Sequence, residues 1–212
     1  MSSRLRKTLS KASLRGLYAI AMVLCENNPD RKTQPLKVLV SGGASIILSK
    51  RQPHLESTKC IEITAKDPEV EELFAAKQDA WKKLPHVYQN WLVADHLSDE
   101  LKERQMIYNN SINNEFGPCW YAEGLAVYTT DWKFQLGAQI RRSILFGADQ
   151  TALEKVFAII RILVDDQYKH PLLVSHVYAW YSNRALLAPD DLRYIVAAYQ
   201  ARFPNELTPI TL

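Results

Sequence analysis

A short segment near residue 40 holds residue types from which a phosphate site can be built. The apolar run 36–40 is followed by Ser41, Gly42, Gly43 and Ser45. Two glycines directly after a strand let the chain turn tightly, and they let a phosphate approach the main-chain N–H groups at the start of the next helix. The segment is neither a G-x-G-x-x-G motif nor a Walker A loop, so an ordinary strand-to-helix turn stays open as an explanation.

A second group of reactive residues follows about twenty positions later. Cys60 and Glu62 alternate with Ile61 and Ile63, which predicts a strand with a polar face. Cys60, or a serine beside backbone N–H donors, has the chemistry of a nucleophile. The 5 histidines are dispersed, however, so the sequence places no general base. Capping roles for the serines and a buried apolar role for Cys60 stay open.

Hydrophobic periodicity predicts the elements that position these residues. We expect helices over 10–25, from 44, over 67–84, over 98–104, and from about 151 and 189. We expect strands over 36–40, 60–64, 88–94, 106–108 and 125–128. The chain from 132 onward is predicted to be helical. The expected organisation is a basic helix at 1–29, a mixed α/β domain at 30–130 and a helical part at 131–212.

Composition limits the classes of protein to which the chain can belong. The 212 residues are 47% hydrophobic, which suffices for a sizeable core and argues against disorder. The net charge of +3 argues against a dedicated nucleic-acid binder. Three separated cysteines without a C-x-x-C pair predict free thiols in a reducing compartment. We therefore expect a cytoplasmic protein.

The first 25 residues leave two further interpretations open. Residues 4–15 are basic and rich in serine, and no acidic residue precedes Glu26. Such a segment is typical of a solvated helix face, of a mitochondrial presequence, or of a surface that contacts RNA. The apolar stretch 17–25 is too short to span a membrane.

The segment 40–63 resembles the opening of the polymerase-β-like nucleotidyltransferase superfamily, especially its small fungal and toxin-type members. In that family a strand leads to Gly-Gly-x-Ala and an apolar helix, then to a basic residue and a strand with Asp-x-Asp. The resemblance extends more loosely over residues 36–165. It implies a mixed α/β fold and Mg²⁺ held by paired carboxylates, which positions a nucleotide for transfer.

The chain departs from the family pattern at the carboxylates. Cys60 stands where the first carboxylate is expected, and Glu62 stands where the second is expected. Gln139 replaces a common lysine in the helix after the last strand, and Asp95 and Glu123 are candidates for a third carboxylate. Glu62 is therefore the predicted metal and catalytic residue, and Mg²⁺ is the implied cofactor.

Three functions remain as expectations. The first is a divergent nucleotidyltransferase-like protein, a transferase if active, that binds a nucleotide or another phosphate-bearing ligand. Its predicted ligand-binding residues are Gly42, Gly43, Lys50, Arg51 and Arg141. The second is acyl or small-molecule transfer in a fungal-type biosynthetic pathway, with a substrate that can be borne on tRNA. Its covalent residue would be Ser41, Ser45 or Cys60. The third is a non-catalytic interaction protein.

Overall fold

The computed structural model describes residues 2–49, 60–66, 69–83, 91–94, 97, 100–145, 150–181 and 187–211, with the side chains of residues 2–13 and 166 outside that description. The chain forms two compact units, which divide between Thr130 and Asp131. Among the described residues, no helix is long and apolar enough to cross a membrane.

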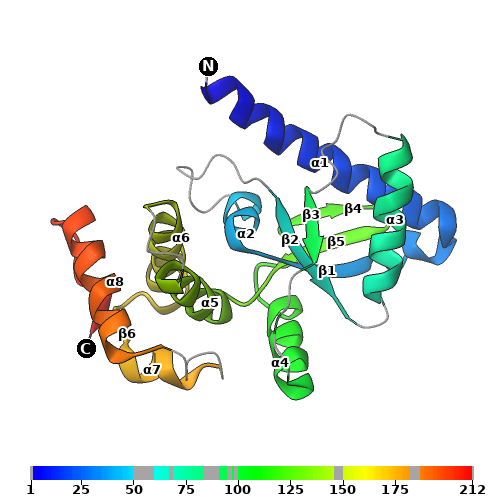
Figure 1. Ribbon diagram of the computed structural model, residues 1–212. Coiled ribbons are helices and arrows are strands. Elements are labelled where there is room, and N and C mark those ends of the chain that lie inside the picture. The colour runs from blue at the N-terminus through cyan, green and yellow to red at the C-terminus, as the bar shows by residue number, and fades with distance from the viewer. Residues whose placement is uncertain are drawn as a thin grey trace. The chain divides into compact units, whose positions relative to one another are not determined.

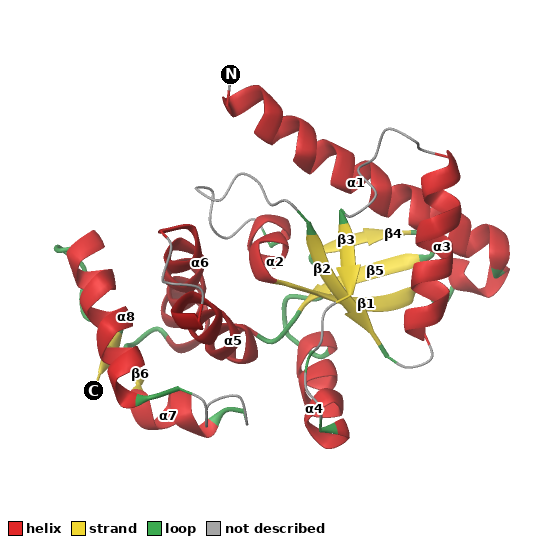
Figure 2. Cartoon of the chain, in the orientation of Figure 1, coloured by secondary structure: helices red, strands yellow, loops and turns green. Residues whose placement is uncertain are grey.

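The first unit alternates helices and strands along the chain (Figures 1 and 2). In order, its elements are α1 (Ser2–Asn27), a 3-10 turn (Pro29–Lys32), β1 (Leu36–Ser41), α2 (Gly42–Leu48), β2 (Ile61–Ala65), α3 (Glu69–Lys83), β3 (Leu92–Ala94), α4 (Leu101–Ile112), β4 (Trp120–Ala122) and β5 (Leu125–Thr129). The predicted α/β class is therefore confirmed.

The five strands form one mixed sheet in the order β3-β2-β1-β5-β4. β1 runs antiparallel to β2 and parallel to β5, β3 runs parallel to β2, and β4 runs antiparallel to β5. The apolar run of β1 agrees with its central position, because Val38, Leu39 and Val40 are all buried although they point to alternate faces.

One face of this sheet carries the main core of the unit. α1 and α3 pack against each other there. Leu17, Ile20 and Leu24 of α1 recur at helical spacing and are buried with Val38, Val40, Ile63 and Val127 of the strands. Each such buried aliphatic side chain contributes about 1.5–3 kcal/mol relative to exposure. The core therefore fixes which side chains of β1 and β2 point away from α1.

α4 packs against β1 and β5. Glu103, Ile107 and Ser111 recur every four residues, and all three are buried, so they form one stripe of the helix. Leu39 is also buried, and it points to the face of β1 opposite to Val38 and Val40. Figure 1 shows α4 on the side of the sheet away from α1 and α3.

The structure corrects the predicted strand over 106–108. These three residues lie inside α4, which begins at Leu101 rather than at 98 and continues to Ile112. Three adjacent apolar residues imitate a strand. Only Ile107 of the three is buried, and its buried neighbours are four positions away on each side. The helical period therefore governs this segment.

The remaining predicted elements of the first unit agree with the structure within a few residues, except that α1 begins at Ser2 rather than at 10. The predicted strands 36–40, 60–64 and 125–128 correspond to β1, β2 and β5, and the strand predicted over 88–94 is described only as β3. The edge strand β4 was missed, since its three residues are only partly covered and show no clear alternation of apolar side chains.

The second unit is mostly helical, as predicted. It contains α5 (Trp132–Leu145), α6 (Gln150–Arg161), a π-helical segment (Ile162–Tyr168), α7 (Val174–Ala179) and α8 (Pro189–Arg202). It also contains two strands that the sequence did not predict, β6 (Leu172–Leu173) and β7 (Ile210–Thr211), which pair in parallel. Only two residues lie in each, too few for a period of two to show.

Gly124 provides a test of how α1 is seated on the sheet. Its φ is +93°, and a Cβ atom at this position would lie 2.6 Å from the carbonyl oxygen of Ala21 and 2.6 Å from Sγ of Cys25. We expect Gly124→Ala to lower the free energy of unfolding by about 3 kcal/mol or more, because backbone strain and a clash with α1 add. Urea denaturation monitored by tryptophan fluorescence measures this.

Gly117→Ala is the matched control. Gly117 has φ +65°, but a Cβ atom there would meet nothing within 4 Å. This variant should lose only the strain, about 1 kcal/mol. Equal losses in the two variants would contradict the close packing of Gly124 against α1.

Candidate functional site

The strand register brings the glycine turn and Glu62 together. β1 ends at Ser41, and Ser41 lies directly opposite Glu62 in the antiparallel ladder. Directly opposed residues of an antiparallel pair point to the same face of a sheet. Ser41 and Glu62 therefore share the face opposite to the α1 core, and Thr64 follows on that face two residues later.

The turn itself has the strand-to-helix geometry that its glycines predict. Ser41 is extended, and Gly42 has a φ of 64°, a backbone conformation that favours glycine. Ser45 is fully buried, and its hydroxyl donates to the carbonyl oxygen of Gly42 over 2.7 Å. This hydroxyl serves the fold of the turn, so Ser45 is poorly placed to attack a substrate.

The other residues of the turn are also covered. Gly42 and Gly43 are buried, and Ser41 is 7% exposed. Glu62 is only partly buried, as is Cys60, which is not in a disulfide bond. Of the predicted cluster, Glu62 is therefore the residue best placed to meet a ligand.

Of the two candidates for a further carboxylate, only Glu123 lies among the described residues, and it is not beside Glu62. Asp95 lies outside the described residues, and Glu123 lies in the turn between β4 and β5. There the carbonyl oxygen of Gly124 accepts from the N–H of Leu36, at the start of β1. Leu36 is five residues from Ser41, or about 16 Å along a strand, so Glu123 is at the wrong end of the sheet.

Among the described residues, no group of three or more His, Cys, Asp or Glu side chains could hold a metal ion. Of the predicted carboxylates that the structure describes, Glu62 is the one on this face of the sheet, and one carboxylate is too few for a two-metal site. The structure also shows Glu103, a carboxylate on the buried stripe of α4 that is 7% exposed. The four-residue spacing of Glu103, Ile107 and Ser111 could have shown from the sequence that these residues share one helix face. The wrong prediction of a strand at 106–108 hid this spacing.

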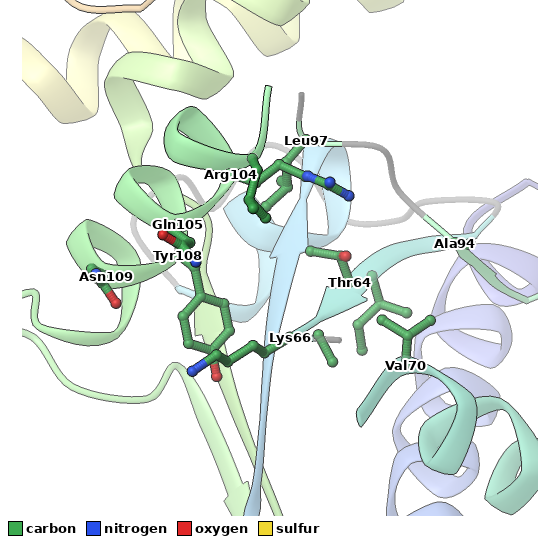
Figure 3. Close-up of a pocket in the computed structure, with 12 residues that line it drawn as sticks. Thr64, Lys66, Val70, Ala94, Leu97, Arg104, Gln105, Tyr108 and Asn109 are labelled. Carbon is green, nitrogen blue, oxygen red and sulfur yellow. The ribbon is translucent and has the colours of Figure 1, made fainter. Parts of the chain in front are cut away.

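A cavity of about 330 Å³ lies beside the carboxyl ends of β2 and β3, and we call it the Arg104 cavity. Its volume falls in the range of small-molecule sites. Four elements or their flanking residues line it (Figure 3). The lining residues are Ile63, Thr64, Ala65, Lys66, Val70, Ala94, Leu97, Leu101, Arg104, Gln105, Tyr108 and Asn109.

The Arg104 cavity is cationic. Lys66 and Arg104 line it, and the described lining includes no carboxylate. Figure 3 shows Arg104 beside Thr64 at one end, and Lys66 extending toward Tyr108 at the other. Thr64 shares its sheet face with Glu62, so the cavity is continuous with the side of the sheet that carries the predicted site. Such a lining suits a ligand with an anionic group.

A second cavity, of about 390 Å³, adjoins the first, and we call it the Arg31 cavity. Tyr108 lines both cavities and so forms a wall between them. The other lining residues of the Arg31 cavity are Arg31, Thr33, Gln34, Pro35, Lys37 and Glu69. All of these except proline are polar or charged.

Ion pairs already engage one cation of the Arg31 cavity. Nε of Arg31 donates to Glu72 over 3.0 Å, and a second guanidinium nitrogen donates to the other oxygen of the same carboxylate. The third nitrogen lies 3.6 Å from Glu69. Arg31 therefore holds α3 to the turn after α1, while Lys37 is exposed on β1.

Tyr108 keeps its proton over a wide pH range. Burial raises the pKa of Tyr108 to about 12, and the neighbouring Glu69 carboxylate adds to this increase. The hydroxyl donates to the carbonyl oxygen of Lys37 over 3.3 Å. At neutral pH the group is thus a hydrogen-bond donor placed where the two cavities meet.

The structure does not test the other predicted ligand-binding residues. Lys50 and Arg51 lie outside the described residues. Arg141 is exposed on α5 in the second unit, and its role stays a prediction. Residues 4–15, the predicted RNA contact, lie within α1. Sequence reasoning missed Lys66, Arg104 and Tyr108, because no spacing in the sequence relates β2 to α4.

Comparison with known proteins adds no relative. No family model matches the sequence, no curated protein matches it, and no solved structure matches the fold.

Removing the Tyr108 hydroxyl should change how stability depends on pH. The folded state holds the phenol proton up to about pH 12, against 10.0 for an ordinary tyrosine. The stability of the folded state is not affected by this phenol below pH 10. It falls as the pH rises from 10 toward 12, because the unfolded chain releases the phenol proton at a lower pH than the folded chain does. Tyr108→Phe should reduce the fall in urea midpoint between about pH 9 and about pH 11.5.

Tyr121→Phe, at an exposed tyrosine of β4, is the control for losing a hydroxyl at the surface. The buried Tyr199 of the second unit also has a pKa of about 12. Part of the loss of stability at alkaline pH should therefore remain in Tyr108→Phe. An unchanged pH profile in Tyr108→Phe would contradict the burial of this phenol.

Proposed function

We propose that the first unit is a divergent nucleotidyltransferase-like domain that binds a nucleotide or another phosphate-bearing ligand. The ligand lies on the sheet face that carries Ser41, Glu62 and Thr64, with its anionic group in the Arg104 cavity. The observation that carries the proposal is this cavity, whose described lining combines two cations with apolar walls and no carboxylate.

The topology supports the proposal. A strand leads through a glycine turn into a helix and then to an antiparallel strand whose Glu62 faces the end of the first. This is the arrangement that the resemblance implies for residues 40–63. The buried turn acts on the site indirectly, since it ends β1 at Ser41 and so sets the position of β1 relative to Glu62.

The lining chemistry supports a phosphate group over a neutral ligand. Arg104 has a planar guanidinium that can donate two parallel hydrogen bonds to phosphate oxygens, and Lys66 supplies a compact charge. Thr64 adds a hydroxyl donor from the sheet. The aliphatic side chains of Val70 and Leu97 line the same cavity, and an apolar wall beside the cations strengthens charge-assisted contacts.

Ligand-induced stabilisation tests the proposal. Thermal unfolding is followed with ATP, CTP and GTP at millimolar concentration, each with and without Mg²⁺. A ligand present at about 100 times its Kd should raise Tm by about 5 °C or more. Absence of a shift with every nucleotide and with inorganic triphosphate would count decisively against the proposed function.

Arg104→Gln locates the binding. This variant should weaken nucleotide binding by about 10- to 100-fold, since a hydrogen bond between charged groups is lost. Arg193→Gln removes an exposed arginine of α8 and is the matched control. Isothermal titration calorimetry measures both. Equal affinity in Arg104→Gln and the unchanged chain would place the ligand elsewhere.

Mg²⁺ enters the proposal through Glu62. The ion would meet one carboxylate of the protein and would need phosphate oxygens to complete its shell. We expect Mg²⁺ to strengthen nucleotide binding to the unchanged chain by about tenfold, and Glu62→Gln to remove that gain while it keeps metal-free binding. A Mg²⁺ gain that survives in Glu62→Gln would exclude Glu62 as the ligand.

A further inference from the structure

The Arg31 cavity differs from the Arg104 cavity in the balance of its charges. Its described lining holds two cations, Arg31 and Lys37, and one carboxylate, Glu69. Glu72 is outside this lining, but its carboxylate accepts two hydrogen bonds from the guanidinium of Arg31. Positive and negative charges are therefore equal in number, so the Arg31 cavity has no excess of cations with which to attract a bare anion.

Two opposite charges of this lining stay available to a ligand. The Lys37 ammonium is exposed on the sheet face opposite to the α1 core, and among the described residues no ion pair engages it. The Glu69 carboxylate meets Arg31 through one oxygen at 3.6 Å, which is longer than a charge-assisted hydrogen bond. Because a carboxylate has about four lone-pair sites, Glu69 can accept from a second cation while it keeps Arg31.

The Tyr108 hydroxyl adds a hydrogen-bond donor close to both charges. It donates to the carbonyl oxygen of Lys37 over 3.3 Å, and the charge of Glu69 contributes to its raised pKa. A bond of this length between hydroxyl and carbonyl oxygens is weak. The hydroxyl can therefore exchange the carbonyl oxygen for a charged acceptor, which forms the stronger hydrogen bond.

The remaining lining suits a short polar group. The Arg31 cavity has a volume of about 390 Å³, and the only aliphatic side chain of its described lining is Pro35. Gln34 supplies an amide that can both donate and accept. The Thr33 hydroxyl donates to the carbonyl oxygen of Asp30 over 3.1 Å, so its lone pairs can accept from a ligand.

A ligand that carries a single charge fits this cavity poorly. A phosphate beside the Lys37 ammonium would also lie in the field of the Glu69 carboxylate, which repels it. A simple amine beside Glu69 would in the same way be repelled by Lys37. A ligand that carries one charge of each sign, close together, meets both groups favourably.

We infer that the Arg31 cavity binds a free α-amino acid with a short polar side chain, such as serine. Its carboxylate accepts from the Lys37 ammonium and from the Tyr108 hydroxyl. Its ammonium group donates to the Glu69 carboxylate, and its side chain meets Thr33 and Gln34. This binding site goes beyond the proposed function and does not rest on it, because the phosphate-bearing ligand is placed in the Arg104 cavity.

Analogues that lack one charge test the inference on the full chain. L-Serine, L-serinamide, N-acetyl-L-serine and L-leucine are titrated and followed by ligand-observed NMR. L-Serine should bind with a Kd of about 1 mM or lower. Serinamide lacks the carboxylate and N-acetylserine lacks the ammonium group, so each should bind at least about tenfold more weakly than serine. Leucine should also bind more weakly, since the described lining offers its side chain little apolar surface.

Two variants assign each charge of the ligand to its partner. Lys37→Gln should weaken serine by about tenfold and leave serinamide within about twofold. Glu69→Gln should weaken serine by about tenfold and leave N-acetylserine no weaker. Lys102→Gln and Glu71→Gln remove exposed charges of α4 and α3 outside both cavities, and they are the matched controls. Arg104→Gln, which changes only the other cavity, should leave serine within about twofold.

Several results would overturn the amino-acid site. They are no binding of serine at about 10 mM, equal affinity for serine and serinamide, leucine binding as tightly as serine, or an unchanged serine affinity in Lys37→Gln. A loss of serine binding in Arg104→Gln alone would place the amino acid in the other cavity. Failure of every nucleotide to bind would remove the proposed function and leave this site standing. Circular dichroism shows whether each variant is folded, and the charge analogues decide the question on the unchanged chain.

Discussion

The first unit depends on the antiparallel register between β1 and β2. Because side chains alternate along a strand, a slip of one residue would turn Glu62 and Thr64 into the α1 core and bring Ile61 and Ile63 to the opposite face. The buried aliphatic residues on the core face make such a slip costly. The hydrophobic core thus fixes which side chains form the polar face.

Charge distributes unevenly over the face that results. Glu62 lies opposite Ser41 at one end of the β1–β2 pair, and Val38 pairs with Ala65 at the other end, where Lys37 and Lys66 flank the ladder. α4 runs over this face, contributes Arg104 and Tyr108 to the cavities, and buries Glu103 beneath itself. The candidate site is therefore formed by the β1–β2 pair and α4. The glycine turn can be buried without closing this site.

Sequence periodicity predicted much of this unit, and its failures have physical causes. The long amphipathic pattern of α1 and the alternating pattern of β2 each bury one face against the core, so both were recognised. The apolar residues around Ile107 were assigned to a strand, because three adjacent apolar side chains carry no period. That error hid the stripe of Glu103, Ile107 and Ser111, and with it the helix that forms one wall of the cavity.

The sequence by itself determined the strand, the glycine turn and the helix at 36–48, since local sterics and hydrophobic pattern act over a few residues. It also predicted Glu62 as the metal-binding carboxylate, and this role stays a prediction. Only the tertiary structure decided that Ser41 faces Glu62, that Tyr108 donates to the carbonyl oxygen of Lys37, and that Arg104 lines a cavity beside β2 and β3. These pairs join segments 21 to 71 residues apart. Sheet register and the packing of α4 bring them together, and neither is encoded in any single stretch of sequence.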